Sequence, residues 1–381
     1  MASAALPEVV WSESNTTPDA IEAALRGLLA QRARLKQDAK GDGLVPARVL
    51  NMLVFVEHEH SREIAERLSG VGRYHASRTV VLSYERERKE LDARVRIASE
   101  RDRGPGEPAL AREIAFVQIG ERHLDDLSTI ADPLVISDLP TLLWSPHRHP
   151  AQADALLELA QATLIDSIEE PVWSAAIERA CALSERAYVV DLAWLRSTPW
   201  RERVAATFDP ARMRTELHSL ERLEIRHHPA STVAAMLFVG WLASRLDWKL
   251  ERSQIRRRAG EEGALSTDAR TPAGGRIELC LRAAPELSVP GLAGVRLCSA
   301  SGLQIDLDRG PGGLHERRRD THGSEREWTL LGASRGEGGI LGEGIRQALL
   351  RDPAYLPALH AAQAMLPRDG TELDEATAVA A

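Results

Sequence analysis

Aromatic residues and cysteines are scarce in this 381-residue sequence: aromatics make up 4% of it, and its three cysteines are Cys181, Cys280 and Cys298. Three scattered cysteines exclude a disulfide framework, and the lack of a CxxC pair removes a common signature of structural zinc sites. The sequence also lacks the roughly 18 consecutive apolar residues of a membrane helix, and its N-terminus does not resemble a secretory signal. We therefore expect a soluble, cytoplasmic protein with reduced thiols that does not bind membranes.

Positive charge is too sparse for a general nucleic-acid binder. The formal net charge is −8, whereas affinity for phosphate backbones requires concentrated lysine and arginine. The one arginine triplet, at 256–258, is soon followed by Glu261 and Glu262. We interpret the triplet as the solvated face of a linker and expect no nucleic-acid partner.

Motifs of several enzyme classes are missing as well. The chain contains no GxSxG nucleophile elbow, no GxxxxGK[ST] phosphate loop and no HExxH helix. The second predicted strand-to-helix turn lacks the GxGxxG fingerprint, so the expected sheet shows no sign of a dinucleotide site. We therefore expect no catalytic residues, no bound cofactor and no metal.

The first half of the chain alternates between strand-like and helix-like segments, which is typical of an α/β fold. A nearly continuous apolar run at 48–57 predicts a strand covered on both faces, whereas alternation at 91–99 predicts a half-exposed one. The expected strands are 48–57, 77–84, 91–99, 112–119, 140–144, 163–167 and 187–194, and helices are expected at 151–160 and 171–184. We predict a mostly parallel open sheet with flanking helices and an antiparallel extension formed by the strands at 91–99 and 112–119.

The second half predicts a smaller α+β domain. A strand at 221–228 and a helix at 231–247 precede a charged, linker-like segment near 251–275. Consecutive antiparallel strands are then expected at 276–283, 294–301 and 303–309, followed by a charged interruption at 315–327, a further strand at 328–334 and a helical C-terminus. The predicted domains are an N-terminal helix and tail (1–45), an α/β domain (46–205), an α+β domain (206–370) and a disordered tail (371–381).

Two histidine-rich segments follow predicted strands. The HEH segment, His58 to His60, offers two imidazoles, but its spacing fixes no third metal ligand, and we interpret it as a solvated turn. The other segment leaves the strand at 140–144, and ligands of open α/β sheets collect outside the carboxyl ends of strands. Trp144, His147, Arg148 and His149 could therefore meet an anionic substrate. An ordered surface loop is the alternative.

Cys280 and Cys298 lie on strands that we expect to be neighbours. A disulfide would require their Cα atoms to lie within about 7 Å of each other. We expect core thiols, and a redox switch remains the alternative.

The stretch DLAWLRSTPWRERVA, at 191–205, concentrates two tryptophans and three arginines. Tryptophan and arginine are enriched at the energetic centres of protein interfaces, and the stretch lacks a set of catalytic acids and bases. We expect it where the last parallel strand turns into a helix, with Trp194 inward and with Arg196 and Arg201 near the surface. Replacing either arginine with alanine should then weaken partner binding and leave folding stability nearly unchanged. Core packing alone is the alternative.

Four segments of the chain resemble the OpcA family of glucose-6-phosphate dehydrogenase assembly proteins. They are HASRTVVL (75–82), DLPTLLW (138–144), DLAWLRSTPWRERVA (191–205) and GWLASRL (240–246). The resemblance implies a non-catalytic partner that binds glucose-6-phosphate dehydrogenase and promotes its active oligomer or raises its activity, in support of the oxidative pentose phosphate pathway. The partner-binding residues would be Asp191, Trp194, Arg196, Trp200 and Arg201.

A second hypothesis is that the protein is a sugar-phosphate-binding enzyme or sensor that uses the loop at 144–149. Such a protein should bind or turn over a phosphorylated sugar alone, whereas an assembly factor should act only when the dehydrogenase is added. A structural subunit of some other complex is a third possibility.

Overall fold

The structure is a computed structural model that describes residues 8–38, 48–71, 77–99, 111–250, 255–257, 264–331 and 336–367. The chain forms two units. The first unit comprises residues 1–165, 186–190 and 337–350, and the second comprises 166–185, 191–336 and 351–381. The units interleave along the chain, whereas the domains predicted from the sequence are consecutive segments. The expected tail at 371–381 lies outside the described residues.

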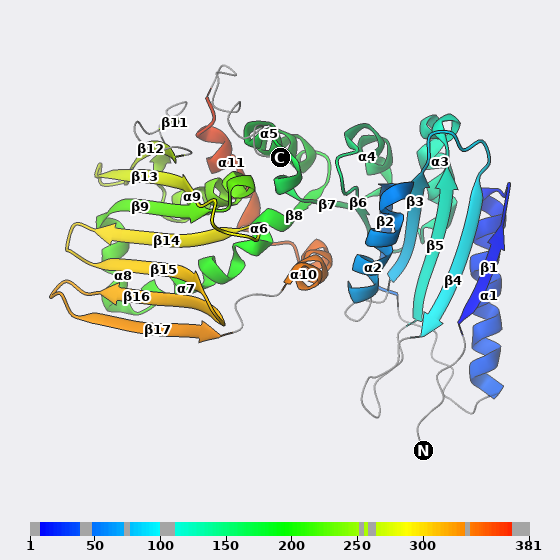
Figure 1. Cartoon of the computed structure of the whole chain (residues 1–381), viewed down its shortest axis with the longest axis horizontal. Helices are drawn as coiled ribbons and strands as arrows, with labels where there is room; N and C mark the ends of the chain where they lie inside the picture. Colours follow the sequence, from blue (N-terminus) through cyan, green and yellow to red (C-terminus); the bar gives the residue numbers. More distant parts are fainter. Residues whose placement is uncertain are drawn as a thin grey trace. The chain divides into compact units, whose positions relative to one another are not determined.

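An eight-stranded sheet in the order β1-β4-β5-β3-β2-β6-β7-β8 organises the first unit (Figure 1). Its strands are β1 (Val9–Glu13), β2 (Leu50–Glu57), β3 (Ser77–Tyr84), β4 (Asp92–Ser99), β5 (Ala111–Ile119), β6 (Thr141–Trp144), β7 (Ala162–Ile165) and β8 (Tyr188–Asp191). β2 pairs in parallel with β3 and β6, while β4 pairs antiparallel with β5 and β1. The predicted α/β class, with a mostly parallel sheet and an antiparallel extension, is confirmed. The edge strand β1 was missed, because it lies in the segment expected to hold only a helix and a tail.

The burial of these strands follows their sequence patterns. All residues of β2 but the last are buried, as its continuous apolar run predicts. In β4, Ala93, Val95 and Ile97 are buried against helix α1 while the residues between them face outward. The helices described in this unit are α1 (Pro18–Asp38), α2 (Ser61–Val71), α3 (Leu127–Ala131), α4 (Pro150–Leu156) and α10 (Gly336–Leu350), with 3-10 turns η1 (His58–His60), η2 (Glu121–Asp126), η3 (Asp132–Leu134) and η4 (Leu157–Leu159).

The strand order reverses between β2 and β6. From β2 the chain crosses to β3 on one side, whereas from β6 it continues to β7 and β8 on the other. Such a reversal leaves the carboxyl ends of the two central strands side by side, at the place where open α/β sheets bind their ligands. Here these ends are Glu57 of β2 and Trp144 of β6.

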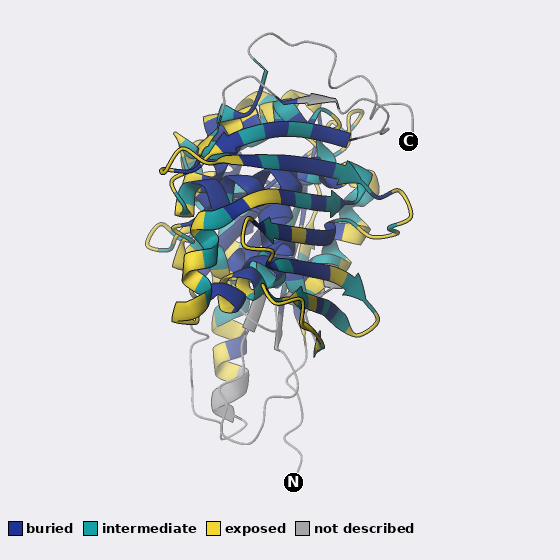
Figure 2. Cartoon of the chain, turned by 90° about the vertical axis from the view of Figure 1, so that its left-hand side faces the viewer, coloured by how far each residue is buried: buried dark blue, intermediate teal, exposed yellow. Residues whose placement is uncertain are grey.

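The second unit contains a nine-stranded sheet in the order β10-β12-β13-β9-β14-β15-β16-β17, with β11 paired to β12. Figure 2 shows these strands banded with buried and partly buried residues and exposed residues gathered at the turns. The strands are β9 (Leu220–His227), β10 (Lys249–Leu250), β11 (Arg256–Arg257), β12 (Ala264–Arg270), β13 (Arg276–Ala283), β14 (Leu292–Ser299), β15 (Gln304–Gly310), β16 (Gly313–Arg319) and β17 (Glu325–Leu331).

Helix α9 forms the centre of this unit. Most of its 14 residues are buried, and it contacts β9, β13, α5, α6 and α11. A helix that is apolar on all sides, as this one is, must be covered on all sides. The helices and 3-10 turns of the unit are η5 (Ser167–Glu169), α5 (Trp173–Ser184), α6 (Leu192–Arg196), α7 (Thr198–Phe208), α8 (Ala211–Arg214), η6 (Thr215–Ser219), η7 (Pro229–Ser231), α9 (Thr232–Arg245) and α11 (Tyr355–Ala364).

The expected neighbouring strands of Cys280 and Cys298 are not neighbours. β9 lies between them, pairing in parallel with β13 and antiparallel with β14. Two strand spacings of about 4.8 Å put the cysteines beyond the reach of a disulfide. All three cysteines are free, and burial raises the pKa of the Cys181 thiol to about 11.

Two segments expected to be irregular contain strands. Strand β12 lies within the expected linker at 251–275, and strands β16 and β17 form a hairpin across the expected interruption at 315–327. The hairpin was not predicted because its sequence is highly charged. Its outward positions carry cross-strand ion pairs such as Arg319–Glu325, with 2.5 Å between nitrogen and oxygen. Within the expected arginine triplet, Arg256–Arg257 form β11, and the third arginine is outside the described residues. No helix in the described part of the chain is both long and apolar enough to cross a membrane.

Gly240 allows α11 to approach α9 closely. A Cβ at this position would lie 2.1 Å from the backbone oxygen of Ala358. The Gly240→Ala variant should therefore lose about 1–3 kcal/mol of the free energy of unfolding, because the new methyl group meets backbone atoms of α11, which cannot move aside as a flexible side chain could. Urea denaturation measures this loss. In the control Gly27→Ala, on α1, the new methyl group meets nothing within 4 Å, and stability should rise by up to about 1 kcal/mol. Equal effects of the two changes would contradict the close approach.

Candidate functional site

Asp191 ends β8 and caps α6 in the second unit. Its carboxylate accepts hydrogen bonds from the backbone nitrogen of Ala193 at 2.9 Å and from the backbone nitrogen and hydroxyl of Ser167 at 3.2 and 2.5 Å. The side chain is fully buried, and this burial raises the pKa of Asp191 to about 6. Asp191 thus joins the start of α6 to η5 within the second unit.

Arg196, at the end of α6, forms a buried ion pair with Asp166. Two guanidinium nitrogens donate to the two carboxylate oxygens, each at 2.7 Å, and both side chains are 6% exposed. This bidentate geometry is the strongest arrangement of such a pair. Because Asp166 also caps η5 by accepting from the backbone nitrogen of Ile168, the pair joins α6 to the turn that follows β7.

Arg201 and Trp194 join the α6–α7 corner to helix α11. The Arg201 guanidinium lies over the Trp194 ring, 3.4 Å from its centroid, and donates to the Thr198 hydroxyl at 2.9 Å. The Trp194 indole nitrogen donates to Asp352 at 2.9 Å, and its ring meets Tyr355 edge to face. Burial lowers the pKa of Arg201 to about 10, and the ring face and Asp352 compensate part of that desolvation.

The structure confirms part of what was expected of this stretch. The residues do lie where β8 turns into a helix, and Trp194 and Trp200 point inward, each 2% exposed. The expectation that Arg196 and Arg201 lie near the surface is wrong, since the whole residues, backbone included, are only 9% and 8% exposed. Their partners Asp166 and Asp352 lie outside the stretch, so the sequence pattern could not reveal them.

An apolar groove of about 540 Å³ runs beside this corner in the second unit. Phe208 of α7 and Leu242 of α9 are buried in its floor, and Trp241 and Leu246 are partly exposed along it. Its lining residues are Arg201, Glu202, Val204, Ala205, Phe208, Asp209, Arg214, Leu217, Trp241, Leu242, Arg245, Leu246 and Ala354. The family-like segments at 191–205 and 240–246 therefore share this surface, a relation that their separation in the sequence concealed.

The two histidine-rich segments of the first unit meet at the switch point between β2 and β6. The rings of His60 and His147 stack with 4.2 Å between their centroids, and His147 Nε2 lies 3.7 Å from a Glu63 oxygen. Burial, and then the charge of His60, lower the pKa of His147. The sequence did not show that the two segments meet, and Glu63 was not among the predicted residues, although it stands one helical turn after His60.

The turn from β2 into α2 is unsuited to a dinucleotide. Its sequence, EHEHS at 57–61, contains no glycine and contributes Glu57 and Glu59, with Glu63 in the following helical turn. Pyrophosphate binding at such a turn requires close backbone approach and favours the positive end of a helix dipole. Carboxylates at this position repel that group.

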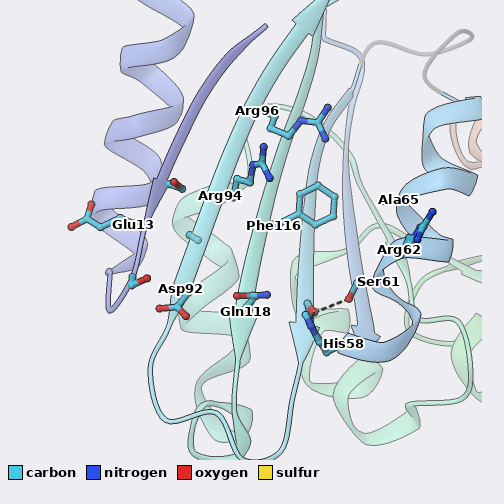
Figure 3. A pocket seen from close by; sticks show the side chains of 14 residues that line it. Glu13, His58, Ser61, Arg62, Ala65, Asp92, Arg94, Arg96, Phe116 and Gln118 are labelled. Atoms are coloured by element: carbon cyan, nitrogen blue, oxygen red, sulfur yellow. Dashed lines mark hydrogen bonds between the residues drawn. The ribbon is translucent and has the colours of Figure 1, made fainter.

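A hollow of about 500 Å³ lies elsewhere on the first unit, beside β4, β5 and α2 (Figure 3). Arg94 and Arg96 of β4 and Phe116 and Gln118 of β5 line one side, with His58, Ser61 and Arg62 opposite. His58 Nδ1 lies 3.1 Å from the Ser83 hydroxyl, which also contacts Ser61. None of residues 144–149 lines this hollow, so it does not support a sugar-phosphate site in that loop.

The buried ion pair leads to a stability prediction opposite to the one made from sequence. Arg196→Ala leaves the Asp166 carboxylate buried without its partner, which typically costs about 3–5 kcal/mol. We expect a large fall in the melting temperature, measured by calorimetry. Arg62→Ala, which removes an exposed ion pair with Glu66 at 3.2 Å, is the control and should change stability by less than about 0.5 kcal/mol. Similar melting temperatures for the two variants would show that the Asp166 pair does not hold the corner.

Comparison with known proteins identifies the family. The model described as the N-terminal domain of the glucose-6-phosphate dehydrogenase subunit matches residues 69–182, and the model described as its C-terminal domain matches 187–359. Curated relatives from Synechocystis and Synechococcus elongatus, provisionally named as OxPP cycle proteins OpcA, are 27% and 26% identical over 33% and 36% of this chain. These alignments span 27% and 32% of the relatives' own lengths.

The solved structures that match the chain at low similarity include oxidoreductases. One from Sinorhizobium meliloti is 12% identical with a TM-score of 0.46, covering 84% of this chain and 96% of that one. A Gfo/Idh/MocA family oxidoreductase from Vibrio cholerae is 13% identical with a TM-score of 0.43, covering 83% and 95%. The family models, by contrast, match most of the chain, and on that basis it belongs to the OpcA family of glucose-6-phosphate dehydrogenase subunits.

Proposed function

We propose that this protein is a non-catalytic, cytoplasmic subunit that binds glucose-6-phosphate dehydrogenase, promotes its active oligomer and thereby supports the oxidative pentose phosphate pathway. The observation that carries the proposal is the match of both subunit domains, over 69–182 and 187–359. Because these matches reach into both units of the structure, the proposed role belongs to the whole chain and not to one module of it.

The chemistry of the described residues supports a non-catalytic role. The switch point of the sheet, where a nucleotide would bind, carries carboxylates and histidines in place of a glycine-rich turn. Asp191 has a raised pKa, which is often seen in catalytic acids. Its three acceptor contacts are with Ser167 and Ala193, so this carboxylate acts as a cap within the corner.

We further propose that the dehydrogenase binds the groove between α7 and α9. Of the five buried residues first expected to contact the partner, Arg201 lines this groove, and the other four would act indirectly, by fixing α7 in position. Partly exposed Trp241 and Leu246 offer apolar area, and exposed Arg214 and Arg245 stand at the edge. Tryptophan surrounded by arginine is a typical composition for the energetic centre of an interface.

The first experiment measures activation. The purified chain should show no dehydrogenase activity by itself, and adding it to glucose-6-phosphate dehydrogenase from the same organism should raise that enzyme's rate and its oligomeric mass in light scattering. The effect should be the same before and after thiol reduction, because β9 separates Cys280 from Cys298. Unchanged kinetics together with separate elution at micromolar concentrations would refute the proposal.

The second experiment locates the surface. Trp241→Ala should weaken association with the dehydrogenase at least tenfold, which corresponds to about 1.4 kcal/mol. Because the Trp241 ring also packs edge to face on buried Phe238, a thermal melt must show that the variant is folded at the assay temperature. Isothermal titration measures the affinity. Trp11→Ala is the matched control, since Trp11 is also partly exposed but does not line the groove. If the control weakens binding equally, or Trp241→Ala does not, the groove is not the binding surface.

A further inference from the structure

Three potential metal ligands come together where β2 and β6 end. His60, Glu63 and His147 each offer a donor atom, and these atoms all lie within 4.8 Å of one another. His60 and Glu63 stand one turn apart at the start of α2, so their side chains share a face of the helix. His147 reaches them from the loop between β6 and α4.

The surrounding contacts hold the two segments together. Arg67 of α2 lies over the Trp144 ring, 5.0 Å from its centroid, and His149 meets Phe55 of β2 edge to face at 5.2 Å. Between these anchors, His147 and Arg148 adopt φ values of 60° and 63°. Two successive non-glycine residues in the left-handed region are costly, and such strain concentrates at functional sites. The loop is therefore built to place the His147 ring against His60.

The charge around the cluster favours a cation over an anion, because three glutamates outnumber Arg67, which pairs with a Glu63 oxygen at 3.6 Å. Glu57 and Glu59 also lie near His60, with donor atoms of these three residues within 4.8 Å of one another. A phosphate would meet these carboxylates as well as Glu63, whereas a divalent ion would be neutralised by them. Two imidazole nitrogens and one carboxylate oxygen are also the protein ligands of many open zinc sites, which keep a further position for solvent.

We propose that His60, Glu63 and His147 bind a divalent first-row transition-metal ion of the zinc type. This proposal replaces the sequence-based expectation of no metal, and it does not depend on the proposed function. The two rings now stack with 25° between their planes, so their in-plane lone pairs lie in two nearly parallel planes and do not both point at one ion between the rings. Binding requires one ring to turn, and the His60 side chain, 36% exposed, has the room. The bound ion would thus take the place of the contact between the His60 and His147 rings, and it would link the turn after β2 to the loop after β6.

The test uses the full chain, freed of metal by chelation and then titrated with Zn²⁺ by calorimetry and with Co²⁺ by visible absorption. We expect one ion per chain, with Co²⁺ bands that report nitrogen ligation. His147→Ala and Glu63→Gln should each weaken binding by at least about 100-fold, since even residues that only orient metal ligands change affinity by about 10- to 100-fold. Circular dichroism checks that each variant is folded.

His58→Ala is the matched control. His58 belongs to the same HEH turn, but it contacts Ser83 and is not among the clustered ligands. Its affinity for Zn²⁺ should stay within about threefold of the parent chain. The proposal is overturned if the parent chain binds no ion at millimolar concentration, if His147→Ala binds as tightly as the parent, or if His58→Ala loses as much affinity as His147→Ala.

Discussion

The buried contact between Arg196 and Asp166 is the constraint on which the second unit depends. It joins the turn after β7 to the end of α6, and α6 in turn contacts α7 and the central helix α9. Moving two charges out of water is expensive, and only good geometry compensates that cost. The bidentate pair supplies this geometry, so the corner can adopt few other arrangements without leaving a charge unpaired.

Trp194 extends the same corner to a distant part of the chain. Its indole nitrogen donates to Asp352 and its ring contacts Tyr355 at the start of α11. Helix α11 then crosses α9 at Gly240, where the lack of a side chain permits close backbone approach. Polar contacts at one end and close packing at the other thus determine where the last helix lies.

Local patterns of apolar and polar residues in the sequence were sufficient to predict the parallel sheet. Its central strands are buried on both faces, and their sequences are therefore nearly continuous apolar runs. Local patterns failed for β16, because its exposed Arg317 and Arg319 and even its buried Glu316 are charged, a composition that resembles a loop. They also failed for the order of β13, β9 and β14, since pairing between distant segments leaves no local signal. Strand order is a property of the whole sheet.

For the candidate sites too, the sequence predicted features that depend on local composition and missed those that depend on contacts between distant segments. The sequence identified the stretch at 191–205 and both histidine-rich segments, because their composition is unusual. It could not show that Arg196 is buried, since burial depends on Asp166, nor that His60 and His147 stack, since their loops meet only when β2 pairs with β6. Residue type indicates which side chains are capable of chemistry, and the fold decides which of them meet.

The interleaving of the two units along the chain limits how the family's two domains can recombine during evolution. The family's two domains match consecutive segments that meet between residues 182 and 187, yet α5 before this junction belongs to the second unit and residues 186–190 after it belong to the first. A recombination event at the junction would therefore separate η5 and α5 from the rest of the second unit, and β8 and α10 from the rest of the first. Exchange of one family domain between relatives would thus mix elements of different origin within both units, so substitutions in the two halves must remain compatible with each other.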